Sequence, residues 1–90
     1  MTVSTNFTDL TPEQQNFILE FLENNFFPRE TFNQKYSAYG LKQVFTRKYF
    51  YVTQEQFVEA MCRVGFSVKM SASGNACFNI SDRSPYLKIR

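Results

Sequence analysis

Residues 36–61 read YSAYGLKQVFTRKYFYVTQEQFVEAM and hold two helical patterns joined by a short connector of mostly aromatic residues. Ser37 is the candidate N-cap of the first helix, because a serine hydroxyl can accept a hydrogen bond from an amide in the first turn. Leu41, Val44 and Phe45 follow at the i, i+3, i+4 spacing of one buried helical face. The stretch fits a helix-turn-helix that touches DNA, and it also fits the packed centre of a small α-rich domain.

The second helix of this pair begins at a capping box. Thr53 and Gln56 have the Thr-x-x-Gln spacing in which each side chain can bond the other residue's backbone N–H. Gly65 predicts the end of this helix, since glycine readily takes the left-handed conformation that follows a helix. In the first helix, Gly40 costs about 1 kcal/mol relative to alanine, and we interpret it as the point where a neighbouring helix approaches closely.

Elements on either side complete the expected fold. A second capping box predicts a helix over residues 12–25, and an extended piece at residues 30–33 can supply a strand. After Gly65 the apolar period changes to two, with the turn-forming SASGN between two alternating runs, which predicts a β-hairpin. Its inward-facing residues are expected to be Phe66, Val68, Met70, Ala76, Phe78 and Ile80.

The order of these elements predicts the fold class. Three helices followed by a β-hairpin make a small α+β domain that is winged-helix-like, and 90 residues suffice for one such domain over residues 1–90. Residues 1–10 and 83–90 lack a strong periodic pattern, and we expect both ends to be loose.

Charge is unevenly distributed along the chain. Residues 1–30 hold one basic and five acidic side chains, for a net charge of −4, whereas residues 31–90 hold nine basic and three acidic ones, for a net charge of +6. Such asymmetry indicates an anionic partner for the second part. The candidate nucleic-acid-binding residues lie on the two central helices and the hairpin, and are Lys42, Gln43, Arg47, Lys48, Gln54, Arg63 and Lys69.

The same region carries residues that oppose contact with DNA. Glu55 and Glu59 lie on the face that the second central helix would present to the major groove, where they would repel phosphates. A basic helix face is also common on surfaces that bind nothing, and it would suit an acidic protein partner as well as phosphates. The pattern leaves these three interpretations open.

Aromatic residues are numerous, with 11 Phe and 5 Tyr. Each buried ring removes about 150–250 Å² from water, and a domain of this length has a modest core. Most rings are expected in the core, while Tyr49 and Tyr51 in the connector are candidates for an exposed partner-binding surface, since Tyr is enriched in interfaces. The excess would also suit a homodimer or stacking on single-stranded bases.

The composition gives little support to catalysis. The chain has no His, which removes the commonest general base and the commonest metal ligand, and it has no glycine-rich phosphate loop. Cys62 and Cys77 are interpreted as free thiols without a His partner. We therefore expect a protein that is not an enzyme and needs no cofactor or metal. Since neither a signal peptide nor a membrane-spanning run is evident, we also expect it to be cytoplasmic.

The sequence resembles a group of small proteins encoded by bacteriophages and prophages. The likeness covers about residues 26–82, and the segments that carry it are Ala38–Lys42, Tyr51–Thr53, Ala60–Met61, Gly65–Phe66 and Asn75–Ile80. Ala38 departs from the Ser, and Gln43 from the His, expected in that group. The resemblance implies a phage setting and no assignable site.

Two functional hypotheses follow. The first is a nucleic-acid-binding accessory or regulatory protein of a phage, which uses a helix-turn-helix and the hairpin as a wing. The second is a phage-encoded inhibitor or adaptor that binds a host protein through an exposed aromatic surface. Salt separates them, because binding that neutralises phosphates weakens steeply as salt rises.

Overall fold

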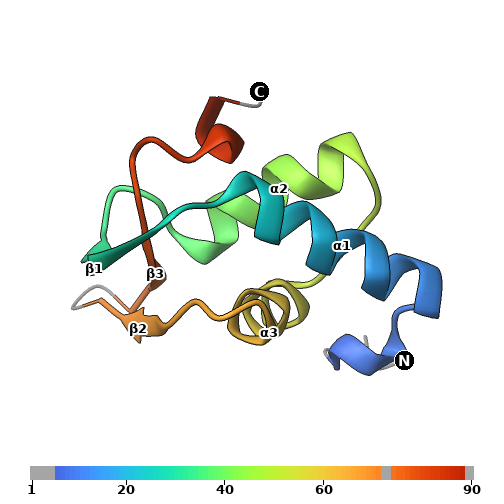
Figure 1. The fold of residues 1–90 in the computed structure, drawn as a ribbon. Coiled ribbons are helices and arrows are strands. Elements are labelled where there is room, and N and C mark those ends of the chain that lie inside the picture. Colours follow the sequence, from blue (N-terminus) through green and yellow to red (C-terminus); the bar gives the residue numbers. More distant parts are fainter. Residues whose placement is uncertain (1–5, 72–73, 89–90) are drawn as a thin grey trace.

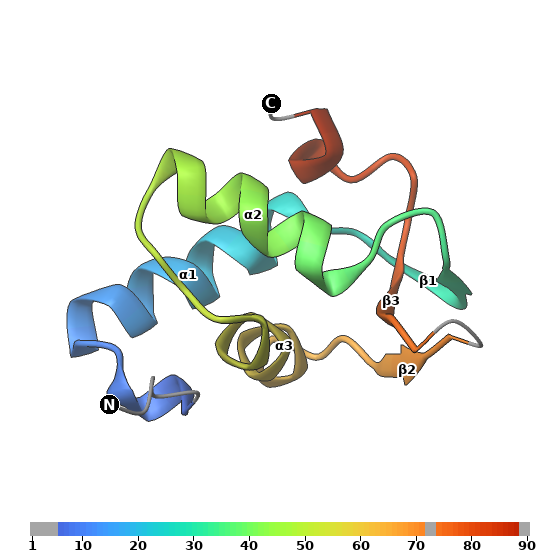
Figure 2. The ribbon, with the colours of Figure 1, turned by 180° about the vertical axis from the view of Figure 1, so that it is seen from behind.

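Three helices and a three-stranded antiparallel sheet form an α+β fold, which the computed structural model describes over residues 6–71 and 74–88 (Figure 1). The sheet lies at one end of the helices, and the view from behind shows α2 in front of α1 (Figure 2). The elements in chain order are the 3₁₀ helix η1 (Phe7–Asp9), α1 (Pro12–Asn25), β1 (Pro28–Asn33), α2 (Ala38–Lys48), α3 (Gln54–Arg63), β2 (Val68–Met70), β3 (Ala76–Ile80) and the 3₁₀ helix η2 (Pro85–Lys88).

The helices begin where the sequence predicts. The Thr11 hydroxyl accepts a hydrogen bond from the Gln14 amide at 3.1 Å, and Gln14 Oε1 accepts one from the Thr11 amide at 3.0 Å. Thr53 and Gln56 repeat this pair of bonds at 3.1 and 2.9 Å, and the Ser37 hydroxyl caps α2. Each capping box satisfies two backbone donors that lack a partner inside the helix. All three predicted helices are confirmed.

The sheet has the strand order β1-β3-β2, so the last strand in the chain lies in the middle. The predicted hairpin is confirmed, with β2 antiparallel to β3 and Lys69 opposite Cys77. The predicted third strand is confirmed as well, although it begins at Pro28 rather than at residue 30. β1 pairs antiparallel with the other edge of β3, and its register shifts between Pro28 and Asn33.

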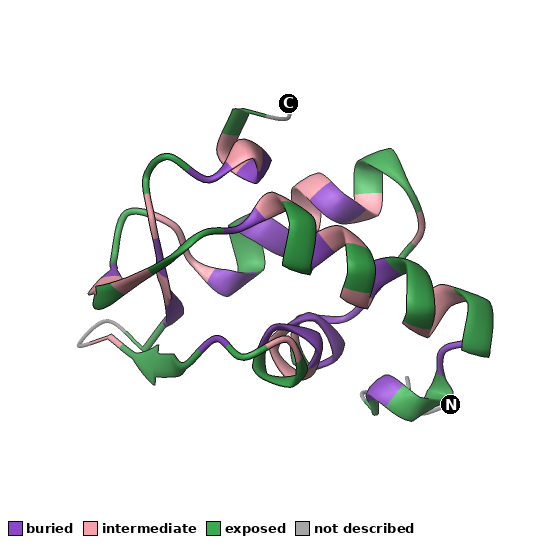
Figure 3. Ribbon diagram, viewed as in Figure 1, coloured by how far each residue is buried: buried purple, intermediate pink, exposed green. Residues whose placement is uncertain are grey.

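The core lies where the helices meet each other and the sheet, as the buried segments in Figure 3 show. In β3, Ala76, Phe78 and Ile80 are buried as predicted. Phe57 of α3 packs on Phe78 with ring centroids 6.2 Å apart. Other large side chains that are fully buried are Phe7, Ile18, Leu22, Phe26, Phe45, Val52, Met61 and Tyr86.

Both ends of the chain are anchored where the structure describes them. Phe7 is fully buried, and the Gln56 side chain donates to the Asn6 carbonyl at 3.0 Å, which ties η1 to α3. At the other end, Tyr86 is 1% exposed, and its ring stacks on Phe26 with centroids 4.4 Å apart. Residues 6–10 and 83–88 each contribute an aromatic ring to the core, whereas residues 1–5 and 89–90, which were also expected to be loose, lie outside the described part of the chain.

The expectation that alternate residues of the first hairpin strand face inward is only partly correct. Phe66 is buried as predicted, but Val68 is 38% exposed and Met70 is 60% exposed. β2 is a three-residue edge strand that pairs only with β3 in the described sheet, so its side chains reach the margin of the core and not its interior. Val68 and Met70 therefore present apolar area at the surface.

Gly40 does not mark a contact between helices, contrary to the sequence interpretation. A Cβ atom placed there would meet only the Ser37 hydroxyl oxygen within 4 Å among the described neighbours, at 3.4 Å, which is ordinary contact. Glycine therefore destabilises this helix without a packing gain. We expect Gly40→Ala to raise the free energy of unfolding by about 0.5–1 kcal/mol, as measured by urea denaturation. An unchanged or lower value would show that the start of α2 requires glycine.

Asn33 holds the end of β1 against β3. Its side chain is buried and donates to the Ile80 carbonyl at 3.1 Å and to Asp82 Oδ1 at 2.8 Å. Its Oδ1 accepts a hydrogen bond from the Lys35 amide at 3.2 Å. The Asn33 hydrogen bond, together with the nearby charges of Lys35 and Arg29, lowers the pKa of Asp82 and outweighs the opposing effect of desolvation. This amide therefore links three segments of the chain.

Candidate functional site

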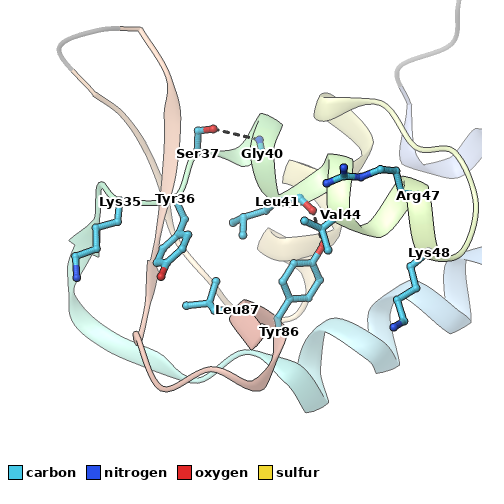
Figure 4. Close-up of a pocket in the computed structure, with 10 residues that line it drawn as sticks. All are labelled: Lys35, Tyr36, Ser37, Gly40, Leu41, Val44, Arg47, Lys48, Tyr86 and Leu87. Carbon is cyan, nitrogen blue, oxygen red and sulfur yellow. Dashed lines mark hydrogen bonds between the residues drawn. The ribbon is translucent and has the colours of Figure 1, made fainter. Parts of the chain in front are cut away.

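Two grooves on the surface contain several of the residues that the sequence singles out. The smaller has a volume of about 350 Å³, is named the α3–β2 groove, and is lined by Gln54, Glu55, Val58, Glu59, Val68, Lys69, Met70 and Ala76. The larger has a volume of about 740 Å³, is named the α2–η2 groove (Figure 4), and is lined by Lys35, Tyr36, Ser37, Gly40, Leu41, Val44, Arg47, Lys48, Tyr86 and Leu87.

The α3–β2 groove is apolar and lacks a net positive charge. Its apolar side chains come from α3, β2 and the first residue of β3, while its two carboxylates, Glu55 and Glu59, come from α3. Lys69 is the one base among the described residues of the lining, and its ammonium lies 5.8 Å from the centroid of the Phe32 ring. Attraction to a phosphate backbone needs an excess of positive charge, which this lining does not have.

Arg63, the basic residue at the end of α3, is engaged within the domain. Its Nη2 and Nε donate to Glu59 Oε2 at 2.7 and 2.9 Å. Its guanidinium carbon also lies 4.7 Å from the centroid of the Phe7 ring. This surface ion pair is worth about 0.2–1 kcal/mol, and it leaves Glu55 as the carboxylate of the groove without an ion pair among the described residues.

The α2–η2 groove has the opposite character. Its charged lining residues, Lys35, Arg47 and Lys48, are all basic. Figure 4 shows Lys35 at one end of the groove and the other two at the opposite end, with apolar side chains between them. Lys35 Nζ lies 3.6 Å from Asp82 Oδ2, whereas Arg47 and Lys48 form no ion pair within the part of the chain that the structure describes. The groove therefore has a base at each end of an apolar floor, one paired with Asp82 and the other two without an ion pair among the described residues.

Tyr86 forms part of the floor of the α2–η2 groove. Its hydroxyl donates a hydrogen bond to the Leu41 carbonyl, which ties η2 to α2. Burial raises the pKa of Tyr86 above its ordinary value near 10, because a phenolate would lose its hydration there. Tyr86 therefore remains protonated and keeps donating this hydrogen bond across the physiological pH range.

The raised pKa of Tyr86 leads us to expect a loss of stability in alkali. The folded state favours the neutral phenol, so its contribution is complete below about pH 10 and falls as the pH rises further, where Tyr86 ionises only in the unfolded chain. The expected slope is near zero below about pH 9 and approaches about 1.4 kcal/mol per pH unit above about pH 10. Urea denaturation between about pH 8 and about pH 11 measures it. Tyr86→Phe should reduce the slope, and an identical slope in that variant would contradict this assignment.

Lys42 is covered, contrary to the expectation that it lies on an exposed basic face. Lys42 is 7% exposed, and its ammonium lies 5.3 Å from the centroid of the Tyr39 ring and 5.0 Å from that of Tyr51. The half-buried Gln43 donates to the Tyr39 hydroxyl at 3.1 Å. Sequence periodicity places Lys42 on the outer face of its helix, but two tyrosine rings cover it there by cation–π contact.

The two connector tyrosines have different surroundings. Tyr49 is 40% exposed, and its ring packs against Phe17 and Phe21 of α1 with centroids 5.1 and 4.9 Å apart. Tyr51 is 61% exposed and contacts the ammonium of Lys42. Tyr51 therefore offers more of its ring to a partner, whereas Tyr49 mainly fills an aromatic cluster between α1 and α2.

The structure brings the candidate nucleic-acid-binding residues together only in part. Gln54 and Lys69 line the α3–β2 groove, Arg47 and Lys48 line the α2–η2 groove, and the two grooves share no lining residue. Leu87 was not singled out, and its only sequence signal is its place beside another apolar residue in a polar tail. The exposed side chains of β2 had no such signal, because their alternation predicts an inward face.

Comparison of the chain with protein-family models, curated proteins and solved structures found no match. Within residues 6–71 and 74–88, no three His, Cys, Asp or Glu side chains are placed to hold a metal ion together. No helix in that part of the chain has the length and apolar character needed to cross a membrane. Both thiols are free, with Cys62 exposed and Cys77 buried. Function is therefore inferred from the two grooves.

Proposed function

We propose that this domain is a protein-binding module of winged-helix type that acts as an adaptor or inhibitor. The observation that carries the proposal is the apolar α3–β2 groove, in which Val58, Val68 and Met70 lie beside Glu55 without an excess of basic residues. Apolar area of this kind at the surface favours contact with another protein over contact with phosphates.

Element order and strand order support the winged-helix assignment. Residues 49–53 join α2 directly to α3, the hairpin follows α3, and β1 supplies a third strand on the far edge of β3. In a helix-turn-helix the second helix enters the major groove, and here that helix is α3. The face that a DNA reader would turn to the duplex is therefore the α3–β2 groove, and its lining suits a protein surface better.

The resemblance to phage proteins supports a host protein as the partner. The complementary surface would present apolar side chains to Val58 and Met70, with a base opposite Glu55. Tyr51, with most of its ring exposed, adds a second place where the module can contact a partner. We infer that the module acts in the cytoplasm of the host cell and binds without catalysing a reaction.

Capture from a nuclease-treated lysate of a bacterial host tests this function. The immobilised domain is expected to retain a protein partner, and Met70→Asp should reduce capture by about tenfold or more, because it places a charge in the apolar groove. Met70→Leu keeps the apolar surface and should capture as the parent does. Equal capture by the Asp and Leu variants, or capture of no protein by the parent domain, would overturn the proposal.

Binding to duplex DNA is the second candidate, and the exposed Arg47 and Lys48 favour it. Because Lys42 is covered and Arg63 is paired with Glu59, Arg47, Lys48 and Lys69 are the exposed bases of the candidate set without an ion pair among the described residues. If the duplex binds, its affinity should fall steeply between about 50 and about 200 mM salt. The double variant Arg47→Ala, Lys48→Ala should then bind far more weakly, and binding equal to that of the parent would eliminate this candidate.

A further inference from the structure

We propose that the α2–η2 groove is a second binding site, which takes a short acidic peptide segment with apolar side chains from a partner protein. This groove shares no residue with the α3–β2 groove, so the inference goes beyond the function proposed above. A domain with both sites would connect two partners of different chemistry. Three features of the groove support this ligand: its charges, its apolar floor and the position without a side chain at Gly40.

The charges of the groove select an acidic ligand. Every charged residue of its lining is basic, and these bases lie at its two ends (Figure 4). Arg47 and Lys48 form no ion pair among the described residues, so their charges are available to carboxylates from outside. Carboxylates bonded to such donors form charge-assisted hydrogen bonds, which are stronger than neutral ones.

The floor of the groove selects apolar side chains. Leu41, Val44 and Leu87 line it together with the ring of Tyr86, and Val44 and Leu87 are only half-buried by the domain itself. Its volume of about 740 Å³ lies within the range of roughly 300–1,000 Å³ that is common for ligand sites. Apolar side chains from a peptide would bury the remaining exposed area of this floor.

The floor also favours a peptide over a nucleic acid. Single-stranded bases bind by stacking on exposed aromatic faces. One face of the Tyr86 ring is occupied by Phe26, with centroids 4.4 Å and planes 22° apart, and Tyr86 is 1% exposed. Tyr36 is the other aromatic residue of the lining, and aliphatic side chains supply the rest of the apolar surface. The phosphates of a duplex could contact the basic residues of the groove, but a duplex has no apolar side chains to pack on its aliphatic floor.

Gly40 keeps the groove open on the side of α2. It lines the groove without a side chain, and a Cβ atom there would meet no described atom closer than 3.4 Å. A larger residue at this position would therefore occupy the groove without disturbing the core. Gly40→Leu is thus a blocking variant that retains good helix propensity.

Fluorescence anisotropy tests the site with a labelled dodecapeptide in which two Glu residues alternate with two Leu residues. The parent should bind this peptide, and the double variant Arg47→Glu, Lys48→Glu should bind at least about tenfold more weakly. Arg47→Glu alone should also weaken binding, whereas Arg83→Glu changes the net charge as much as that single variant, lies outside both grooves and should bind as the parent does. Gly40→Leu should also lose at least about tenfold in affinity, and its midpoint temperature of unfolding should be at most about 2 °C below that of Gly40→Ala.

Several outcomes would overturn the inference. It fails if the peptide does not bind at millimolar concentration, or if all these variants bind it equally. It also fails if a labelled DNA duplex or single strand binds in place of the peptide and Gly40→Leu removes that binding. A version of the peptide with Gln for every Glu should bind at least about tenfold more weakly. None of these results depends on Met70, so they are distinguishable from a failure of the proposed function.

Discussion

Replacing Tyr86 by alanine is expected to lower the free energy of unfolding by about 3–5 kcal/mol. The ring of Tyr86 packs on Phe26, Phe21 and Phe57 with centroids 4.4, 5.8 and 6.3 Å apart, and its hydroxyl bonds the Leu41 carbonyl. The variant loses all these contacts and leaves a cavity. A domain of this length has a total stability of roughly 5–13 kcal/mol, so the loss should be visible in urea denaturation followed by circular dichroism.

Two further variants distinguish the contribution of the Tyr86 ring to stability from that of its hydroxyl and from the general effect of removing a tyrosine. Tyr86→Phe keeps the ring and loses only the hydrogen bond, so we expect about 0.5–1.5 kcal/mol of destabilisation. Tyr51→Ala removes a mostly exposed ring and its contact with Lys42, and should cost about 1 kcal/mol or less. If Tyr86→Ala costs no more than Tyr51→Ala, η2 does not contribute to the core as described.

Replacing Asn33 by alanine is expected to lower the free energy of unfolding by about 2–4 kcal/mol. The buried side chain makes three hydrogen bonds. Without it, the Ile80 carbonyl no longer receives the hydrogen bond from the Asn33 side chain. The bond to Asp82 is also lost, so the pKa of Asp82 should rise toward its ordinary value. Urea denaturation gives the stability, and an NMR titration of the Asp82 carboxyl gives the pKa.

Asn25 provides the matched control for this change. Its side chain donates one hydrogen bond, to the Phe21 carbonyl at 2.7 Å in the same helix, so Asn25→Ala should cost about 1 kcal/mol or less. A destabilisation by Asn33→Ala that is no larger than this would contradict the role of Asn33 in joining β1 to β3. An unchanged pKa of Asp82 in the Asn33 variant would contradict the hydrogen bond itself.

The elements that sequence predicts well are those set by neighbouring residues. Thr11, Ser37 and Thr53 cap their helices because each hydroxyl reaches an amide only three residues further along the chain. The hairpin is likewise encoded by a turn between two short alternating runs. Such local signals need no knowledge of the rest of the fold, and for this reason the three helices and the hairpin follow from the sequence.

The residues that were misplaced depend on contacts between distant segments. The alternation of β2 predicts an inward Met70, but whether a strand's face is covered depends on which elements lie over it. Lys42 is covered by Tyr51 from the connector, and Tyr86 enters the core from a polar tail. No periodicity within one element reports such contacts, so burial at these positions had to come from the structure.

The candidate site shows the same division. The sequence puts all seven candidate nucleic-acid-binding residues in one set, of which the structure brings Gln54 and Lys69 together in the α3–β2 groove. It does not show that Arg47 and Lys48 belong to a different groove, whose floor depends on η2 at the other end of the chain. The sequence thus supplied the chemistry of each side chain, while the grouping into two surfaces of unlike charge required the tertiary fold.

The central place of β3 in the sheet has a consequence for synthesis on the ribosome. β1 and β2 bond to β3 and not to each other, so both remain unpaired until residues 76–80 have left the ribosome. The nascent chain can form its helices early, but its sheet must wait for its last strand. Until then two bare strand edges and the side chains of Val68 and Met70 are open to mispairing with other nascent chains.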